Sequence, residues 1–274
     1  MSAAALLAIG IGVGSFGTLV GAGGGFLLVP LLALLEPSMP PRSVTAVSLA
    51  VVAMNATSGA LAYYRQRRID LHSGVPFALA TLPGSIAGVL LTRFVSRTVF
   101  DGIFAVLLIA LAVFVVLAHE DEPTSAPEGG GWGHVLRRLT DASGADYRYR
   151  VNVPLGIGIS LLVGLASSFL GIGGGVIHVP ALVGVLGFPA HIATATSHFV
   201  LAIMASAGTV THVVSGDLDG LYGQTAILGA GAIVGAQIGA RLSTRVHGVV
   251  IIRVLAISLM FVGVRLGVQA LTGG

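Results

Sequence analysis

The chain has 274 residues, of which 55% are hydrophobic and only 9% are charged, with a mean hydropathy of +0.97. Soluble domains carry roughly 25% charged residues, so this chain lacks the charge needed to cover a surface that faces water. Its net charge of +3 is small and its arginines cluster at the ends of apolar runs, which excludes a nucleic-acid-binding surface. It has no cysteine, which excludes disulfides and thiol catalysis. These properties predict an all-α, polytopic integral membrane protein.

The apolar runs form two groups of four. The first group covers residues 3–35, 44–64, 73–92 and 99–118, and the second covers 153–186, 192–214, 221–241 and 248–271. We therefore predict a first transmembrane repeat at 1–118, a linker at 119–150 and a second transmembrane repeat at 151–274. Within the linker, Asp141 to Gly144 is typical of the turn of a small β-hairpin. The linker is expected in the cytoplasm, as a tether between the repeats.

The first run of each group is too long for a simple span and is interrupted by glycines. The interruptions are Gly21–Gly25 and Gly171–Gly175, each with a proline five residues after its last glycine, at Pro30 and Pro180. Glycine frees the backbone and proline removes a hydrogen-bond donor, so a continuous helix is not expected there. Because unwound backbone survives in a bilayer only where protein or a water-filled cavity surrounds it, these breaks indicate a functional interior site.

The two groups are copies of one another. GAGGGFLLVP at Gly21–Pro30 matches GIGGGVIHVP at Gly171–Pro180 at a shift of 150 residues, and VTAVS at Val44–Ser48 matches ATATS at Ala193–Ser197 at a shift of 149. Paired interrupted helices in two repeated halves are the best sequence indication of a transporter site.

Charge predicts that the two repeats are inverted. Arg65, Arg67 and Arg68 follow the second run and place that loop in the cytoplasm, whereas the equivalent segment Ser215–Gly220 has no basic residue and is expected outside. Arg-rich segments then recur at 241–253. Three simple spans plus one broken, re-entrant segment per repeat satisfy this pattern. A parallel arrangement of four plus four spans is the alternative.

The duplicated motif, each copy followed by a T-x-x-S or T-x-T-S segment, resembles the TauE/SafE family of sulfite exporters. The segments are Gly21–Pro30 with Thr45 and Ser48, and Gly171–Pro180 with Thr194, Thr196 and Ser197. The resemblance covers essentially the whole chain. It implies a permease for small sulfur-containing or organic anions such as sulfite, sulfoacetate or sulfonates. One departure is His178, where the first repeat has Leu28.

The predicted spans favour an anionic substrate held by backbone. None of the 11 acidic residues falls at the middle of a run, which argues against a cation. Helix N-termini carry partial positive charge, so two half-helices that begin at the glycine breaks would form one anion site near mid-membrane. The candidate substrate-binding residues are Gly23, Gly24, Gly25, Thr45, Ser48, Asn55, Gly173, Gly174, Gly175, His178, Thr194, Thr196, Ser197 and His198.

Two kinds of candidate also have structural interpretations. A hydroxyl in a membrane helix often bonds a carbonyl of its own preceding turn, and a histidine in a span can be a neutral interhelical donor. The functional interpretation of His178 and His198 is proton coupling, because histidine titrates near neutral pH. We predict no metal, no cofactor and no nucleic-acid partner.

The sequence therefore predicts a secondary transporter in the cell (inner) membrane, multi-pass, with the lipid bilayer and a small anion as partners. A passive anion channel is the alternative, and a homodimer stays open. No hydrolase or metalloprotease motif such as H-E-x-x-H or G-x-S-x-G occurs, so an enzyme is not expected.

Overall fold

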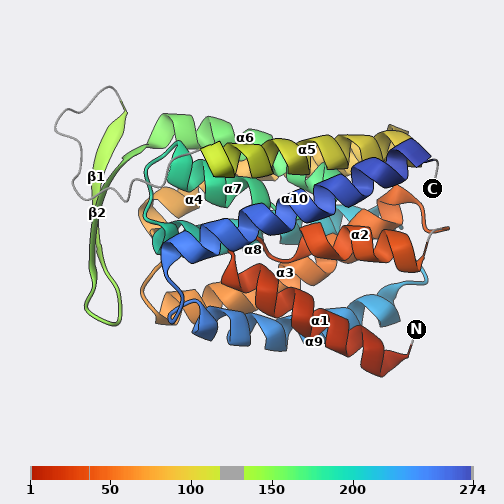
Figure 1. Cartoon of the computed structure of the whole chain (residues 1–274), viewed down its shortest axis with the longest axis horizontal. Helices are drawn as coiled ribbons and strands as arrows, with labels where there is room; N and C mark the ends of the chain where they lie inside the picture. Colours follow the sequence, from red (N-terminus) through yellow and green to blue (C-terminus); the bar gives the residue numbers. More distant parts are fainter. Residues whose placement is uncertain (1, 37, 118–132, 273–274) are drawn as a thin grey trace.

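The structure is a computed structural model that describes residues 2–36, 38–117 and 133–272 (Figure 1). The described elements are, in chain order, α1 (Ala3–Leu19), α2 (Gly25–Leu35), α3 (Pro41–Arg65), α4 (Leu71–Leu91), η1 (Thr92–Phe94), α5 (Arg97–Leu117), β1 (His134–Thr140), β2 (Asp146–Asn152), α6 (Val153–Leu170), α7 (Gly175–Gly184), α8 (Ala190–Val214), α9 (Tyr222–Leu242) and α10 (Gly248–Thr272).

Side chains at the N-termini explain where several helices begin. Asp70 caps α4 by accepting a hydrogen bond from the Ser73 amide at 3.2 Å. Asn152 caps α6 in the same way, through the Leu155 amide at 3.1 Å. Such caps satisfy amides that have no partner within the helix.

The prediction of a helical membrane protein is confirmed. Among the residues that the structure describes, five helices are long and apolar enough to cross a membrane: α3, α4 continued through η1, α6, α8 and α9. The predicted breaks are also confirmed, because both long apolar runs are divided into two helices, α1 with α2 and α6 with α7.

Each half of the chain packs mainly against the other half. α1 lies along α9, α4 along α6, α3 along α8 and α5 along α10. Small residues permit the close approach: a Cβ on Gly14 of α1 would lie 2.6 Å from the Ala232 carbonyl oxygen of α9, and one on Gly84 of α4 would lie 2.8 Å from the Leu165 amide of α6. Close backbone packing over glycine is a common way to associate helices in lipid. The two halves thus share one core.

The bundle has two distinct ends. Figure 1 shows the β-hairpin at one end, here the hairpin end, and the start of α1 and the finish of α10 at the other, the distal end. The Gln66 side chain donates to the Ala240 carbonyl at 3.1 Å, so the loop after α3 and the end of α9 both lie at the hairpin end. At the distal end, Arg93 donates to the Ser215 carbonyl at 2.9 Å.

From residue 133 onward the segment between the two groups of helices forms a β-hairpin, whereas the acidic start of the predicted linker at 120–122 lies outside the described residues. β1 and β2 pair antiparallel around a turn that includes Gly144, whose φ is +87°. The Tyr149 ring packs 4.9 Å from that of Phe188, in the loop between α7 and α8.

An ion pair fixes the hairpin turn to the bundle. Arg68, after α3, contacts the Asp141 carboxylate at 3.0 Å, and the neighbouring Ala142 amide donates to the Gln66 carbonyl at 2.9 Å. Burial by itself would raise the pKa of Asp141, but hydrogen bonds from Ser143, Ala145 and Arg68 outweigh it and lower the pKa to about 2.

Candidate functional site

The two glycine turns meet inside the bundle. Gly21 and Gly23 have φ of +76° and +73°, and Gly171 and Gly173 have φ of +69° and +71°. Residues with a Cβ rarely adopt this left-handed conformation. After each turn a new helix begins, at Gly25 and at Gly175, as the sequence predicts.

The backbones of the two turns touch. A Cβ on Gly25 would lie 2.5 Å from the Ile172 carbonyl oxygen and 2.8 Å from that of Gly171. Reciprocally, a Cβ on Gly175 would lie 2.7 Å from the Cα of Ala22. No side chain larger than hydrogen fits at either position, which accounts for the third glycine of each run.

The residues around the turns repeat the same reciprocity. A Cβ on Gly21 would lie 3.0 Å from the Cα of Thr194, and one on Gly171 would lie 2.7 Å from the Cα of Thr45. The T-x-x-S segment of each half therefore lies against the glycine turn of the other half.

One pair of glycines breaks the symmetry. Gly24 has φ of +84° and a Cβ there would lie 2.7 Å from the Val13 carbonyl oxygen. Its counterpart Gly174 has a helical φ of −59°, and a Cβ there would meet only the Met204 and Val163 side chains at 3.2 Å.

Where the two glycine turns meet, here called the crossing, some backbone amides have no hydrogen-bond partner. Among the described residues, the amides of Gly25 and Phe26 in α2 and of Gly175 and Val176 in α7 donate no hydrogen bond. All four residues are buried. The first amides of a helix have no partner within that helix, so these four donors are available to a ligand.

The candidate serines bond to the glycine turns. Ser48 donates to the Gly171 carbonyl at 2.6 Å, and its counterpart Ser197 donates to the Gly21 carbonyl at 3.5 Å. These bonds join the two halves, so neither serine bonds its own preceding turn. Thr45 does, through the Arg42 carbonyl at 2.9 Å.

Asn55 and His198 meet at Thr18, a residue that the sequence analysis missed. The Thr18 hydroxyl donates to the side-chain Oδ1 of Asn55 at 2.7 Å, and His198 Nε2 lies 3.2 Å from the Thr18 hydroxyl. The Tyr63 hydroxyl donates to the Thr18 backbone carbonyl at 2.8 Å. The available signal was the repeat itself, since Thr18 aligns with Ser168 at the 150-residue shift.

The remaining candidates lie elsewhere. His178 Nε2 lies 3.2 Å from the Ser160 hydroxyl, and its ring stacks edge-on at 6.0 Å from Phe77. Thr196 accepts the Asp70 amide at 3.0 Å, which directs it toward the hairpin end. Among the candidate residues, three buried side-chain atoms have no hydrogen-bond partner in the described part of the chain: Thr194 Oγ1, His178 Nδ1 and His198 Nδ1.

Charge is absent from the crossing in the part of the chain that the structure describes. The buried acids Asp70, Asp141 and Asp217 all lie outside the helices, at N-caps or in loops. Nor do the described residues include a group of three His, Asp or Glu side chains that would suit a metal ion.

Known proteins resemble this chain along nearly its whole length. A family model described as "Sulfite exporter TauE/SafE" matches residues 6–266. The probable membrane transporter protein YunE of Bacillus subtilis is 29% identical over 272 residues, 97% of each chain. A probable membrane transporter protein of Methanocaldococcus jannaschii is 24% identical over 79% of this chain and 74% of its own. No solved structure matches the chain.

Proposed function

Since the chain belongs to the TauE/SafE sulfite exporter family, we propose that this membrane transporter carries a small sulfur-containing or organic anion, such as sulfite, sulfoacetate or another sulfonate. The substrate would bind where the two glycine turns cross. The buried amides without partners at the starts of α2 and α7 carry this proposal, because they supply hydrogen-bond donors and the positive ends of two helix dipoles without any buried cation.

The surroundings of the crossing favour an anion over a cation. A cation would require acidic side chains or free carbonyls. Here the Gly171 and Gly21 carbonyls already accept hydrogen bonds from Ser48 and Ser197. The amides at the starts of α2 and α7 are donors without partners, which would suit the oxygen atoms of a sulfite or carboxylate group once the turns separate.

The two turns have to separate before an anion reaches these amides. The Ile172 and Gly171 carbonyls occupy the space in front of Gly25, and carbonyl oxygens repel an anion. If one turn moves away from the other, the amides at the starts of α2 and α7 would become exposed to one side of the membrane at a time. Rocking of one repeat against the other about a fixed site is a common mechanism for transporters built from repeats.

The two halves of the chain that move against each other would be repeats with opposite orientations in the membrane. α1 begins and α2 ends at the distal end, since Met39, shortly after α2, accepts from Arg97 there at 3.1 Å. α6 begins directly after the hairpin, and the segment after α7 packs on Tyr149 at the hairpin end. Two broken segments entering from opposite ends support inversion over the parallel alternative. The hairpin end, which carries Arg65–Arg68, would face the cytoplasm of a cell (inner) membrane.

Purified full-length protein tests the substrate class. Sulfite, sulfate, methanesulfonate and acetate are added in turn, and the thermal unfolding midpoint is measured against chloride. At least one sulfur oxyanion or carboxylate should raise the midpoint. Stabilisation by cations alone, with no response to any anion, would show that the proposal is wrong.

Transport in proteoliposomes then separates a carrier from a channel. A carrier should exchange internal for external labelled anion and saturate with concentration. A linear current with no coupling to another ion would instead support the passive anion channel.

A further inference from the structure

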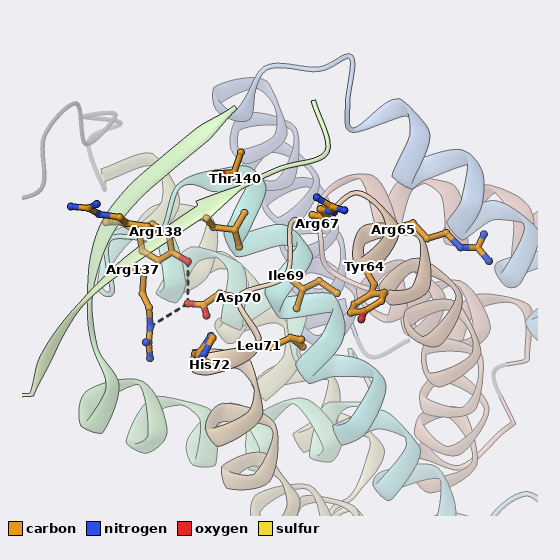
Figure 2. A pocket seen from close by; sticks show the side chains of 12 residues that line it. Tyr64, Arg65, Arg67, Ile69, Asp70, Leu71, His72, Arg137, Arg138 and Thr140 are labelled. Atoms are coloured by element: carbon orange, nitrogen blue, oxygen red, sulfur yellow. Dashed lines mark hydrogen bonds and ion pairs between the residues drawn. The ribbon is translucent and has the colours of Figure 1, made fainter. Parts of the chain in front are cut away.

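A pocket of about 620 Å³ opens at the hairpin end, between the loop after α3, the N-terminus of α4 and β1 (Figure 2). We call it the basic pocket, because its lining includes Arg65, Arg67, Arg137, Arg138 and His72 with a single acid, Asp70.

Three of the arginines are available for a ligand. Asp70 is occupied by Arg137, whose Nε lies 3.7 Å from the carboxylate, and by the Tyr149 hydroxyl, which donates at 3.0 Å. Among the described residues, no acidic side chain lies within ion-pair distance of Arg65, Arg67 or Arg138. Figure 2 shows Arg137 turned inward to Asp70, with Arg65 and Arg138 reaching outward on either side. The pocket therefore has a positive rim.

An apolar groove of about 800 Å³ lies next to the basic pocket. Its lining includes Ala53, Met54 and Leu61 of α3, Phe199 of α8 and Ile233 of α9. The serine and threonine hydroxyls in its lining are already bonded to backbone carbonyls: Thr57 to Ala53, Ser58 to Ile233 and Ser206 to Ala202. The groove thus presents hydrocarbon.

The groove and the basic pocket are continuous. They share Tyr64, Ile69 and Leu71, and the first of these is 61% exposed. Tyr64 lies eleven positions after Ala53 in α3, which is about 16 Å along a helix. Half the hydrocarbon thickness of a bilayer is about 15 Å. The groove therefore matches the depth of one leaflet, with the positive rim at its water-facing end.

We propose that this combined surface binds an anionic phospholipid of the leaflet at the hairpin end, with the headgroup phosphate at the arginine rim and one acyl chain in the groove. A free oxyanion would use only the rim and would leave the apolar groove without an occupant. A neutral lipid would use only the groove. Basic pockets beside transmembrane helices commonly select anionic headgroups. The inference does not depend on which substrate is transported.

Lipid retention by the full-length protein tests the site. The protein is reconstituted in nanodiscs of mixed phosphatidylglycerol and phosphatidylcholine, re-extracted in mild detergent, and its retained lipids are measured by mass spectrometry. The wild type should retain phosphatidylglycerol in excess. In the triple variant Arg65→Gln/Arg67→Gln/Arg138→Gln, the preference for phosphatidylglycerol over phosphatidylcholine should fall about tenfold. Arg42→Gln is the matched control, because Arg42 is an exposed arginine at the opposite end of α3.

A second variant tests whether an acyl chain occupies the groove. Thr57 is exposed in the groove, so the larger side chain of Thr57→Trp should occupy the groove without removing a side chain from the core. This variant keeps all the arginines and should retain less phosphatidylglycerol than the wild type. An added excess of inorganic phosphate distinguishes a lipid headgroup from a free oxyanion as the ligand of the arginine rim. If phosphate displaces the lipid and Thr57→Trp has no effect, the site binds free oxyanions and the proposal is wrong. Equal retention by the triple variant and wild type also overturns it.

Discussion

The contact between the two glycine turns can be tested by adding one methyl group. In Gly25→Ala, the new Cβ would lie 2.5 Å from the Ile172 carbonyl oxygen, 2.6 Å from its carbon and 2.8 Å from the Gly171 carbonyl oxygen. Ordinary contact begins near 3.4 Å, so the turns must separate by about 0.9 Å. The obstacle is backbone on both sides, which no side-chain rotation can relieve.

The expected cost follows from that displacement. Overpacking that moves backbone typically costs about 1–3 kcal/mol, and the lower unfolded-state entropy of alanine returns about 0.4–1 kcal/mol. We expect a net loss of about 1–1.5 kcal/mol, which corresponds to a fall in Tm of about 2–6 °C on the scale of soluble domains. The methyl group would also take up space beside the proposed anion site, so anion-dependent stabilisation should disappear.

Gly174→Ala provides the matched control within the equivalent run. Its Cβ meets only the flexible Met204 side chain and Val163, both at 3.2 Å, and its φ is helical. Its change in stability should stay within about 1 kcal/mol, the range of a small side-chain adjustment. The assay is thermal unfolding of both purified variants with and without a stabilising anion, followed by uptake into proteoliposomes. Equal Tm values and equal anion responses in the two variants would refute the reasoning.

Three further predictions concern topology, the hairpin and proton coupling. Because the chain has no native cysteine, single cysteines report sidedness directly: Asp219→Cys should be labelled from outside intact cells and Ala142→Cys should not, and labelling of both or neither would exclude inverted repeats. The Asp141 carboxylate has a pKa of about 2 against an ordinary 3.8, so it stabilises the fold above pH 3.8 and this contribution is lost as pH falls toward 2. Asp141→Asn should therefore have a lower Tm at neutral pH and a flatter acid dependence, whereas an unchanged acid profile would show that its ion pair contributes nothing. If His198 carries a transported proton, His198→Gln should abolish the response of uptake to an imposed pH gradient while anion binding persists, because glutamine keeps a hydrogen bond but cannot titrate; wild-type uptake that ignores the gradient would contradict proton coupling.

The sequence by itself determined the features that depend only on residues close together along the chain. Low charge and long apolar runs require a membrane as solvent. The glycine runs break both long segments because left-handed turns at Gly21 and Gly171 depend only on local backbone freedom. The hairpin turn at Asp141 to Gly144 is local in the same sense. The internal repeat also indicated that the two breaks belong together, without showing how they meet.

Only the tertiary structure decided which helix faces which. The spans are apolar on all sides, so hydropathy cannot distinguish a buried face from one that faces lipid. The packing of α1 on α9 and α4 on α6 therefore appears only in the fold. The same packing brings Thr18 to Asn55 and His198, directs Ser48 to the Gly171 carbonyl, and sets His178 apart beside Ser160. Partners from different helices, such as Ser48 and Gly171 or Thr18 and His198, are selected by the shape of helix surfaces. A single sequence does not record that shape.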